Sequence, residues 1–227
     1  MNKKIWIILI LLEVFYIIIS TYIALNIKDV LSGEIWRNIA RIIFIPPYLY
    51  FYLKYFKKDK ATEISGLKFY PLLIISIVFI LLYPLTVKDE PFGDFLLKMV
   101  FAVTSIIVGI REELFYRGML QNSLSEKMNR FYSVFITSIF FTIFHFIYII
   151  RFNPIVLIEI FLVSVVIGFI YYHLRSLILV IAIHTIYDVV FSYVPIFGFL
   201  KQVYAINFVV AGVLTILIWS NLQTKVK

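Results

Sequence analysis

The chain of 227 residues has no cysteine, 8 glycines, 7 prolines and only 15% charged residues. The absence of cysteine excludes disulfide bonds, thiol nucleophiles and thiolate metal sites. The low glycine and proline counts exclude collagen-like and glycine-rich chains. Apolar residues make up 63% of the chain, so it is too hydrophobic to be intrinsically disordered. A soluble domain of this size could not cover so much apolar surface. We therefore expect an all-α, polytopic integral membrane protein.

The apolar residues fall into eight runs, each close to the length of about 20 residues that a membrane-spanning helix needs. The expected spans are Ile5–Leu25, Trp36–Phe56, Phe69–Val87, Phe95–Leu120, Phe131–Ile150, Pro154–Leu174, Leu177–Phe197 and Leu200–Ser220. Pro46 and Pro47 lie inside the second run, so we expect that helix to be kinked or broken there. Residues 1–94 hold the first three spans and residues 95–227 the other five, within a single membrane domain.

The net charge of +8 is distributed unevenly between the two sides of an eight-span topology. One side carries Lys3, Lys4, Lys54, Lys57, Lys58, Lys60, Lys68, Lys127, Arg130, Arg175, Lys225 and Lys227. The other side has fewer basic residues and the acidic cluster Asp89, Glu90 and Asp94. The positive-inside rule then places both termini in the cytoplasm, with the chain in the cell membrane. We interpret the basic charge as an orientation signal assisted by anionic lipid, and we expect no nucleic-acid partner.

Four ionisable residues lie close together in the otherwise apolar fourth span: Arg111, Glu112, Glu113 and Arg117. Glu113 and Arg117 are four residues apart, share one helix face and can form an ion pair. Glu112 lies about 100° further round the helix, so it can face a cavity instead. This spacing fits a site in which an arginine neutralises one carboxylate and the other carboxylate acts as a general base. A salt-bridge network that only fixes helix packing is the alternative.

Two later spans each carry a histidine with a partner four residues away. Phe141 pairs with His145, and His184 pairs with Asp188 on one helix face. A rise of about 1.5 Å per residue puts these residues and Glu112 within reach of one polar cavity on the cytoplasmic half.

Such a cavity suits hydrolysis. A carboxylate and an imidazole can deprotonate water, while a second imidazole stabilises the oxyanion. Alternatively, Glu112, His145 and His184 could bind Zn²⁺, which would activate the water.

The sequence Glu112-Glu113-Leu-Phe-Tyr-Arg117, followed by Phe141-x-x-x-His145 and His184-x-x-x-Asp188, resembles three motifs of one family. These are the EExxxR, FxxxH and HxxxN/D motifs of the CPBP family. That family comprises type II CAAX prenyl endopeptidases and the bacteriocin-processing or immunity relatives of the Abi group. The resemblance covers about Arg111 to Asp188, and the first three spans match only in hydrophobicity.

The resemblance implies an intramembrane endopeptidase with an eight-helix core, either glutamate-dependent or a metalloendopeptidase. By this analogy, Glu112 and His145 activate the catalytic water, and His184 and Asp188 serve the oxyanion side. Glu113, Arg117 and Phe141 support the site. Position 188 is often Asn in the family and is Asp in this chain. The implied substrate is a membrane-associated or lipidated peptide, which in a bacterium would be a pheromone or bacteriocin precursor.

Other intramembrane proteases fit less well, because the sequence has neither the HExxH motif of zinc enzymes nor the GxSG motif of rhomboid-type serine enzymes. A non-catalytic membrane scaffold or immunity protein of the same fold is the main alternative. A small transporter that uses Glu112, Glu113 and Asp188 as an ion relay is the third hypothesis.

Overall fold

The computed structural model describes residues 3–57, 71, 74, 95–146 and 155–193. Within these residues the chain is all-helical. The longer helices are α1 (Lys3–Asn26), α2 (Val30–Phe51), α5 (Phe95–Glu113), α7 (Arg130–Ile143), α9 (Ile155–Leu174) and α10 (Leu177–Tyr193). Two π-helical segments, η1 (Tyr52–Phe56) and η2 (Leu114–Gln121), continue α2 and α5, and the short helix α6 (Asn122–Ser125) follows η2.

Polar side chains set the starts of several helices. Asp29 caps α2 by accepting a hydrogen bond from the backbone N–H of Ser32 at 2.8 Å. This cap explains why α2 begins at Val30, before the first residue of the expected span. Asn129 caps α7 in the same way, and Ser176 caps α10. Arg175, with a φ of 49°, makes the turn between α9 and α10.

The second helix contains its two prolines without being broken. We expected a kink or break at Pro46 and Pro47, and the break is absent because α2 continues through both of them to Phe51. Each proline removes one intrahelical hydrogen bond. Phe44 and Tyr48, on either side of the pair, are buried in the core, and their packing holds this part of the helix together.

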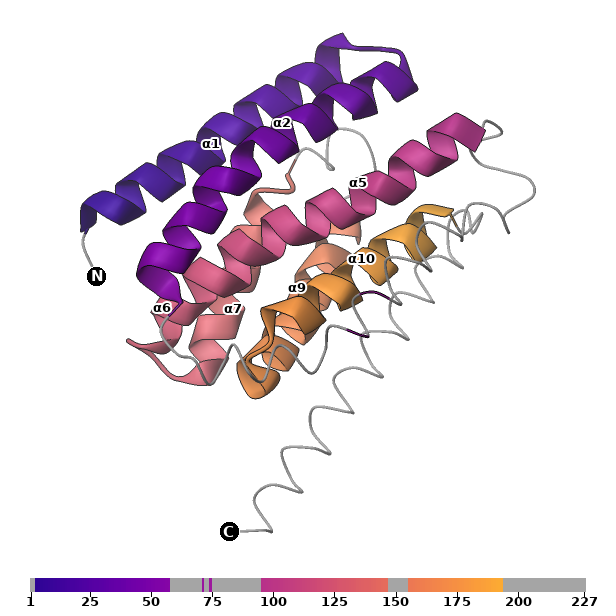
Figure 1. The fold of residues 1–227 in the computed structure, drawn as a ribbon. Helices are drawn as coiled ribbons and strands as arrows, with labels where there is room; N and C mark the ends of the chain where they lie inside the picture. Colours follow the sequence, from indigo (N-terminus) through magenta and orange to yellow (C-terminus); the bar gives the residue numbers. More distant parts are fainter. Residues whose placement is uncertain (1–2, 58–70, 72–73, 75–94, 147–154, 194–227) are drawn as a thin grey trace.

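Helix α5 lies between α2 and α10, while α1 packs on α2 and α7 packs on α9 (Figure 1). The segment η2 extends α5 and contacts α2, α7, α9 and α10. Residues at the end of α5 and in η2 are therefore surrounded by most of the described helices. This position places the Glu112-Glu113 pair at the centre of the described helices.

A row of aromatic rings joins three of these elements. Tyr48 of α2 packs on Phe115 with ring centroids 5.5 Å apart, and Phe115 packs on Tyr116 at 4.9 Å. Tyr116 in turn packs edge-on against Phe141 of α7 at 4.9 Å. Such rings bury large areas in a fixed geometry, so they set the spacing between α2, η2 and α7.

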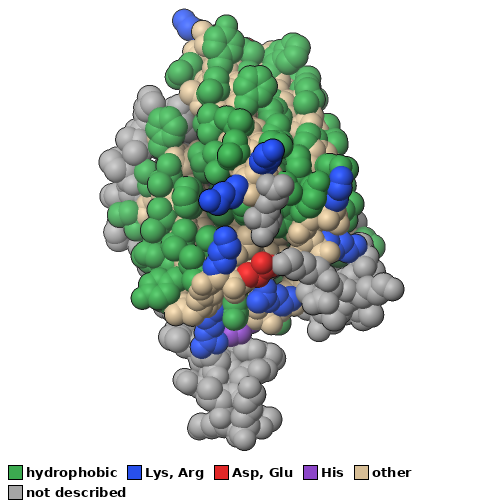
Figure 2. All heavy atoms as spheres, turned by 90° about the vertical axis from the view of Figure 1, so that its left-hand side faces the viewer, with side chains coloured by type: hydrophobic (Ala, Val, Ile, Leu, Met, Phe, Trp, Pro, Cys, Tyr) green, Lys and Arg blue, Asp and Glu red, His purple; other side chains and the backbone are tan. Residues whose placement is uncertain are grey.

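Several charged side chains are buried, and many large apolar side chains are exposed, which is unusual for a soluble protein. Glu13, Glu113 and Arg117 are fully buried, whereas Leu11 is 61% and Ile18 59% exposed. Hydrophobic side chains cover much of the face drawn in Figure 2. Charged groups inside and large apolar groups outside are typical of a protein that lies in lipid. The structure thus agrees with a membrane protein.

The eight expected spans are not all shown. By length and composition, α1 is the one helix among the described residues that could cross a membrane. Arg130–Ile143, Ile160–Leu174 and Leu177–Val189 are apolar but shorter. The spans expected at Phe69–Val87 and Leu200–Ser220 lie outside the described residues, apart from residues 71 and 74.

Candidate functional site

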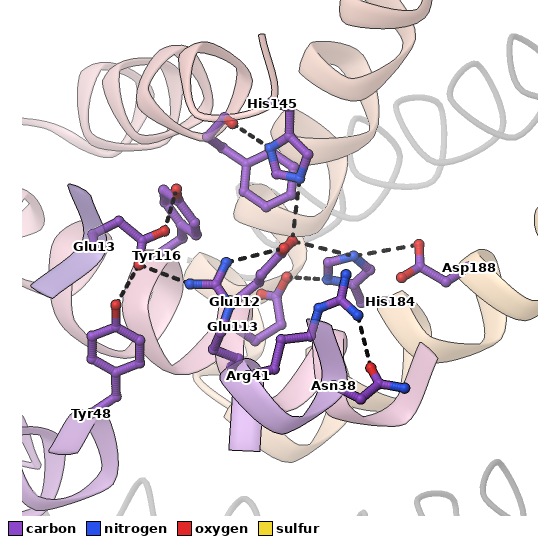
Figure 3. Close-up of polar contacts among 12 residues, drawn as sticks. Glu13, Asn38, Arg41, Tyr48, Glu112, Glu113, Tyr116, His145, His184 and Asp188 are labelled. Atoms are coloured by element: carbon purple, nitrogen blue, oxygen red, sulfur yellow. Dashed lines mark hydrogen bonds and ion pairs between the residues drawn. The ribbon is translucent and has the colours of Figure 1, made fainter. Parts of the chain in front are cut away.

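The structure brings together polar residues from α1, α2, α5, η2, α10 and the turn that follows α7 (Figure 3). Glu112 and Glu113 are the last two residues of α5, and Arg117 lies in η2. A π-helical segment widens the helix by one residue per hydrogen-bonded turn and often occurs at functional sites. Here it begins directly after the two glutamates.

Glu113 is fully buried and has two partners. The Nδ1–H of His184 donates a hydrogen bond to Oε1 at 2.7 Å, and Nε of Arg117 lies 3.3 Å from Oε2. The predicted ion pair between Glu113 and Arg117 is therefore confirmed. Arg117 also donates to Ser164 of α9, at 3.0 Å to the backbone oxygen and 2.9 Å to Oγ. Glu113 and Arg117 thus tie α5, η2, α9 and α10 together.

His145 lies in the turn that follows α7. Its Nδ1 lies 2.6 Å from the backbone oxygen of Phe141, and its ring stacks on the Phe141 ring at 4.4 Å. An Nδ1–H that donates to this carbonyl leaves Nε2 for another partner. That Nε2 atom lies 3.6 Å from Oε2 of Glu112. Phe141 therefore orients the imidazole with both its backbone and its ring.

His184 approaches Glu112 from the other side. Its Nε2 lies 4.0 Å from Oε2 of Glu112 and 3.6 Å from Oδ1 of Asp188. Both separations exceed a direct hydrogen bond. The Asp188 side chain is 26% exposed, which makes it the most open of the four candidate catalytic groups.

Glu112 differs from the sequence expectation in one respect. We expected it to be the carboxylate without a cation, but Nη2 of Arg111 lies 3.2 Å from its Oε1. Arg111 and Glu112 are both buried, and the Arg111 guanidinium reaches the carboxylate of its neighbour in the sequence. Its Oε2 is also buried and accepts no hydrogen bond from the residues that the structure describes. This oxygen faces both imidazoles (Figure 3).

Sequence reasoning missed several buried partners. In the sequence, Glu13 is a single carboxyl within the apolar first span, and the structure places it against Arg111. Tyr48 and Tyr116 also contact Glu13, and Ser164 contacts Arg117. A charged residue within an apolar run was the feature of the sequence that could have indicated a buried partner for Glu13. Its partner lies 98 residues further along the chain, so no local spacing could identify it.

The donor set does not fit the zinc ion that the sequence left open. Among the residues in the described ranges, no group of three His, Asp or Glu side chains is arranged to hold a metal ion. Glu112 already has the Arg111 guanidinium at 3.2 Å, and a buried cation repels a second one.

Comparison with known proteins supports the sequence resemblance. Residues 94–190 match the model of a family described as type II CAAX prenyl endopeptidase, Rce1-like. The match includes Glu112, Glu113, Arg117, His145 and His184. No curated protein and no solved structure matches the chain.

Proposed function

Because residues 94–190 form an Rce1-like domain of the type II CAAX prenyl endopeptidase family, we propose that the chain is an intramembrane endopeptidase. It hydrolyses a peptide bond with a water molecule that Glu112 and His145 activate. The catalytic residues are Glu112, His145 and His184. Glu113, Arg117 and Phe141 hold them in position, and Asp188 lies at the open side of the site.

One observation carries this proposal: the buried Oε2 atom of Glu112, which accepts no hydrogen bond from the described residues. It lies 3.6 Å from Nε2 of His145, too far for a strong direct bond. A water molecule between these atoms can donate one proton to the carboxylate while its oxygen stays free to attack a carbonyl carbon. A general base in hydrogen-bond reach of its water is the geometric requirement for such catalysis.

His184 supplies the oxyanion side. Its Nδ1–H donates to the buried Glu113 carboxylate at 2.7 Å, which stabilises a protonated ring. The Nε2–H of that ring then faces the same space as Oε2 of Glu112. When water attacks, the carbonyl oxygen becomes an oxyanion and Nε2–H donates to it. The C–N bond then breaks, and the amine leaves with the proton taken from water.

The proposed reaction requires no metal ion. Arg111 already lies beside Glu112, and in the parts of the chain that the structure covers no three-ligand group exists. The charge that a metal would supply in a metallopeptidase comes here from His184 and Arg111.

The proposed substrate is a membrane-associated or lipidated peptide. Its support is the family match and the largely apolar exterior of the described helices. In a bacterial cell, a pheromone or bacteriocin precursor has the required chemistry. We propose that both termini lie in the cytoplasm, as the basic residues of the sequence indicate.

The test is cleavage of a quenched lipidated-peptide panel by the full chain in proteoliposomes, with products identified by mass spectrometry. We expect cleavage by the wild type and loss of at least 100-fold in His145→Ala and His184→Ala, the scale of a lost acid–base group. A chelator should leave the rate unchanged. Folded variants that cleave like the wild type would overturn the proposal and favour the scaffold alternative.

A further inference from the structure

Helix α1, which lies outside the family match, reaches the candidate site through a buried carboxylate. Glu13 is fully buried, and its Oε2 accepts a hydrogen bond from Nη1 of Arg111 at 2.8 Å. The neighbouring Nη2 of the same guanidinium donates to Glu112 at 3.2 Å. Arg111 is therefore shared between a carboxylate of α1 and the proposed general base.

Glu13 itself is held on both oxygens. Tyr48 of α2 donates to Oε2 at 2.5 Å, and Tyr116 of η2 donates to Oε1 at 3.1 Å. The Arg111 guanidinium also lies over the Tyr16 ring at 3.8 Å. Two hydroxyl donors and a guanidinium satisfy this carboxylate, so its position is fixed relative to α2, α5 and η2.

The same contacts lead to the catalytic histidine by a second route. The Tyr116 ring packs on Phe141 at 4.9 Å, and Phe141 stacks on His145 at 4.4 Å. Glu13 is thus connected to Glu112 through Arg111 and to His145 through Tyr116. These two residues are the pair that would activate water.

We propose that Glu13 is a positioning residue for the proposed hydrolysis. It takes one arm of Arg111, so that the other arm holds Oε1 of Glu112 and leaves Oε2 facing the imidazoles. Without the Glu13 carboxylate, Glu112 is the carboxylate partner that Arg111 keeps among the described residues, and the buried guanidinium turns toward it. This inference rests on the proposed function.

The experiment compares Glu13→Gln with Glu34→Gln in the full chain in proteoliposomes. Glu34 is a matched control, because it is an equally buried carboxylate whose partners are Arg37 and Arg41 of its own helix. We expect Glu13→Gln to lower kcat by about 10- to 100-fold per folded molecule, the effect of misplacing a catalytic group by up to about 1 Å. KM should stay unchanged, because Glu13 does not touch substrate. Glu34→Gln should keep kcat within about twofold of wild type.

A double mutant tests whether Glu13 acts through Arg111. In an Arg111→Gln background, the further change Glu13→Gln should lower kcat by less than about threefold, because the contact is already lost. Fully multiplicative losses would contradict the inference.

Tyr48→Phe provides a milder test if Glu13→Gln does not fold. It removes one of the two hydroxyl donors to Glu13 and leaves Arg111 and Tyr116 in place, so it should lower kcat by about threefold to tenfold, the scale of one typical intramolecular hydrogen bond. Tyr171→Phe, which changes another buried tyrosine on α9, is its control.

The inference is overturned if Glu13→Gln or Tyr48→Phe keeps the wild-type kcat, or if the control variants lose as much. That result differs from failure of the proposed function, in which Glu112→Gln would also cleave at the wild-type rate.

Discussion

The contact between α5 and α10 predicts a large effect from adding one methyl group at Gly109. A Cβ atom there would lie 2.4 Å from Cγ2 of Thr185, where ordinary contact begins at 3.4 Å. Restoring contact distance requires the two helices to separate locally by about 1 Å. Gly109 lies one helical turn before Glu112, and Thr185 follows His184 directly. The separation therefore falls between Glu112 and His184.

The effects on stability and on activity should differ in size. Overpacking costs about 1–3 kcal/mol, whereas Gly→Ala in a helix interior gains about 1 kcal/mol. The net loss of unfolding free energy is then about 0–2 kcal/mol. A displacement of about 1 Å at a catalytic centre can cost about 100-fold in rate. Gly109→Ala should therefore fold well but cleave peptide about 10- to 100-fold more slowly than the wild type.

Peptide cleavage and thermal unfolding of the reconstituted protein measure the two effects. Thr185→Ser removes the clashing methyl group and keeps the hydroxyl that donates to the backbone oxygen of Ala182. The double variant Gly109→Ala/Thr185→Ser should therefore recover most of the activity. Gly33→Ala is the control, because its Cβ would lie 3.5 Å from the nearest atom. Wild-type cleavage by Gly109→Ala, or no recovery in the double variant, would refute this reasoning.

Three further predictions concern stability, pH and metal ions. Arg117→Met leaves the buried Glu113 carboxylate without its guanidinium partner and should lower the unfolding free energy by about 3–5 kcal/mol, measured by denaturant titration in detergent. Hydrogen bonds from Ser32 lower the pKa of the Asp29 carboxyl below its usual value of 3.8, so its charge stabilises the fold above that pH. This contribution is lost as the pH falls through the lower pKa. The Tm difference between wild type and Asp29→Asn should follow the same course, and a pH-independent difference would contradict it. Chelation should leave the cleavage rate unchanged, and recovery of lost activity by added Zn²⁺ would contradict the metal-free assignment.

Local spacing in the sequence was sufficient to predict several features of the fold. The expected spans Phe95–Leu120 and Pro154–Leu174 match α5 with η2 and α9 within one residue at each end. Polar residues flank both hydrophobic runs in the sequence, so hydropathy marks their bounds. The start of α2 was missed, because Ser32, Gly33 and Glu34 interrupt the apolar residues that follow the Asp29 cap, so the segment resembles a loop. Polar residues that follow a cap still form helix when the cap satisfies their backbone.

Contacts distant in sequence could not be predicted from spacing. The Glu113–Arg117 pair follows from its four-residue separation, and the structure confirms it. The Glu13–Arg111 pair spans 98 residues and depends on how α1 packs, which one sequence does not specify. The π-helical geometry of Leu114–Gln121 also has no signal in hydrophobic periodicity. Both features act on Glu112, so the residues around the proposed general base were the hardest to predict.

In the proposed function, Glu112 activates the water that cleaves the peptide. The most direct measurement is the initial cleavage rate of wild type, Glu112→Gln and Glu126→Gln in proteoliposomes, with equal amounts of folded protein. Glu126 is a solvent-exposed carboxylate at the end of α6 and serves as the control. We expect the Glu112→Gln rate to fall by about 100- to 10,000-fold, the contribution of a general base, while Glu126→Gln keeps the wild-type rate. Wild-type cleavage by Glu112→Gln would contradict the role of Glu112 as the general base.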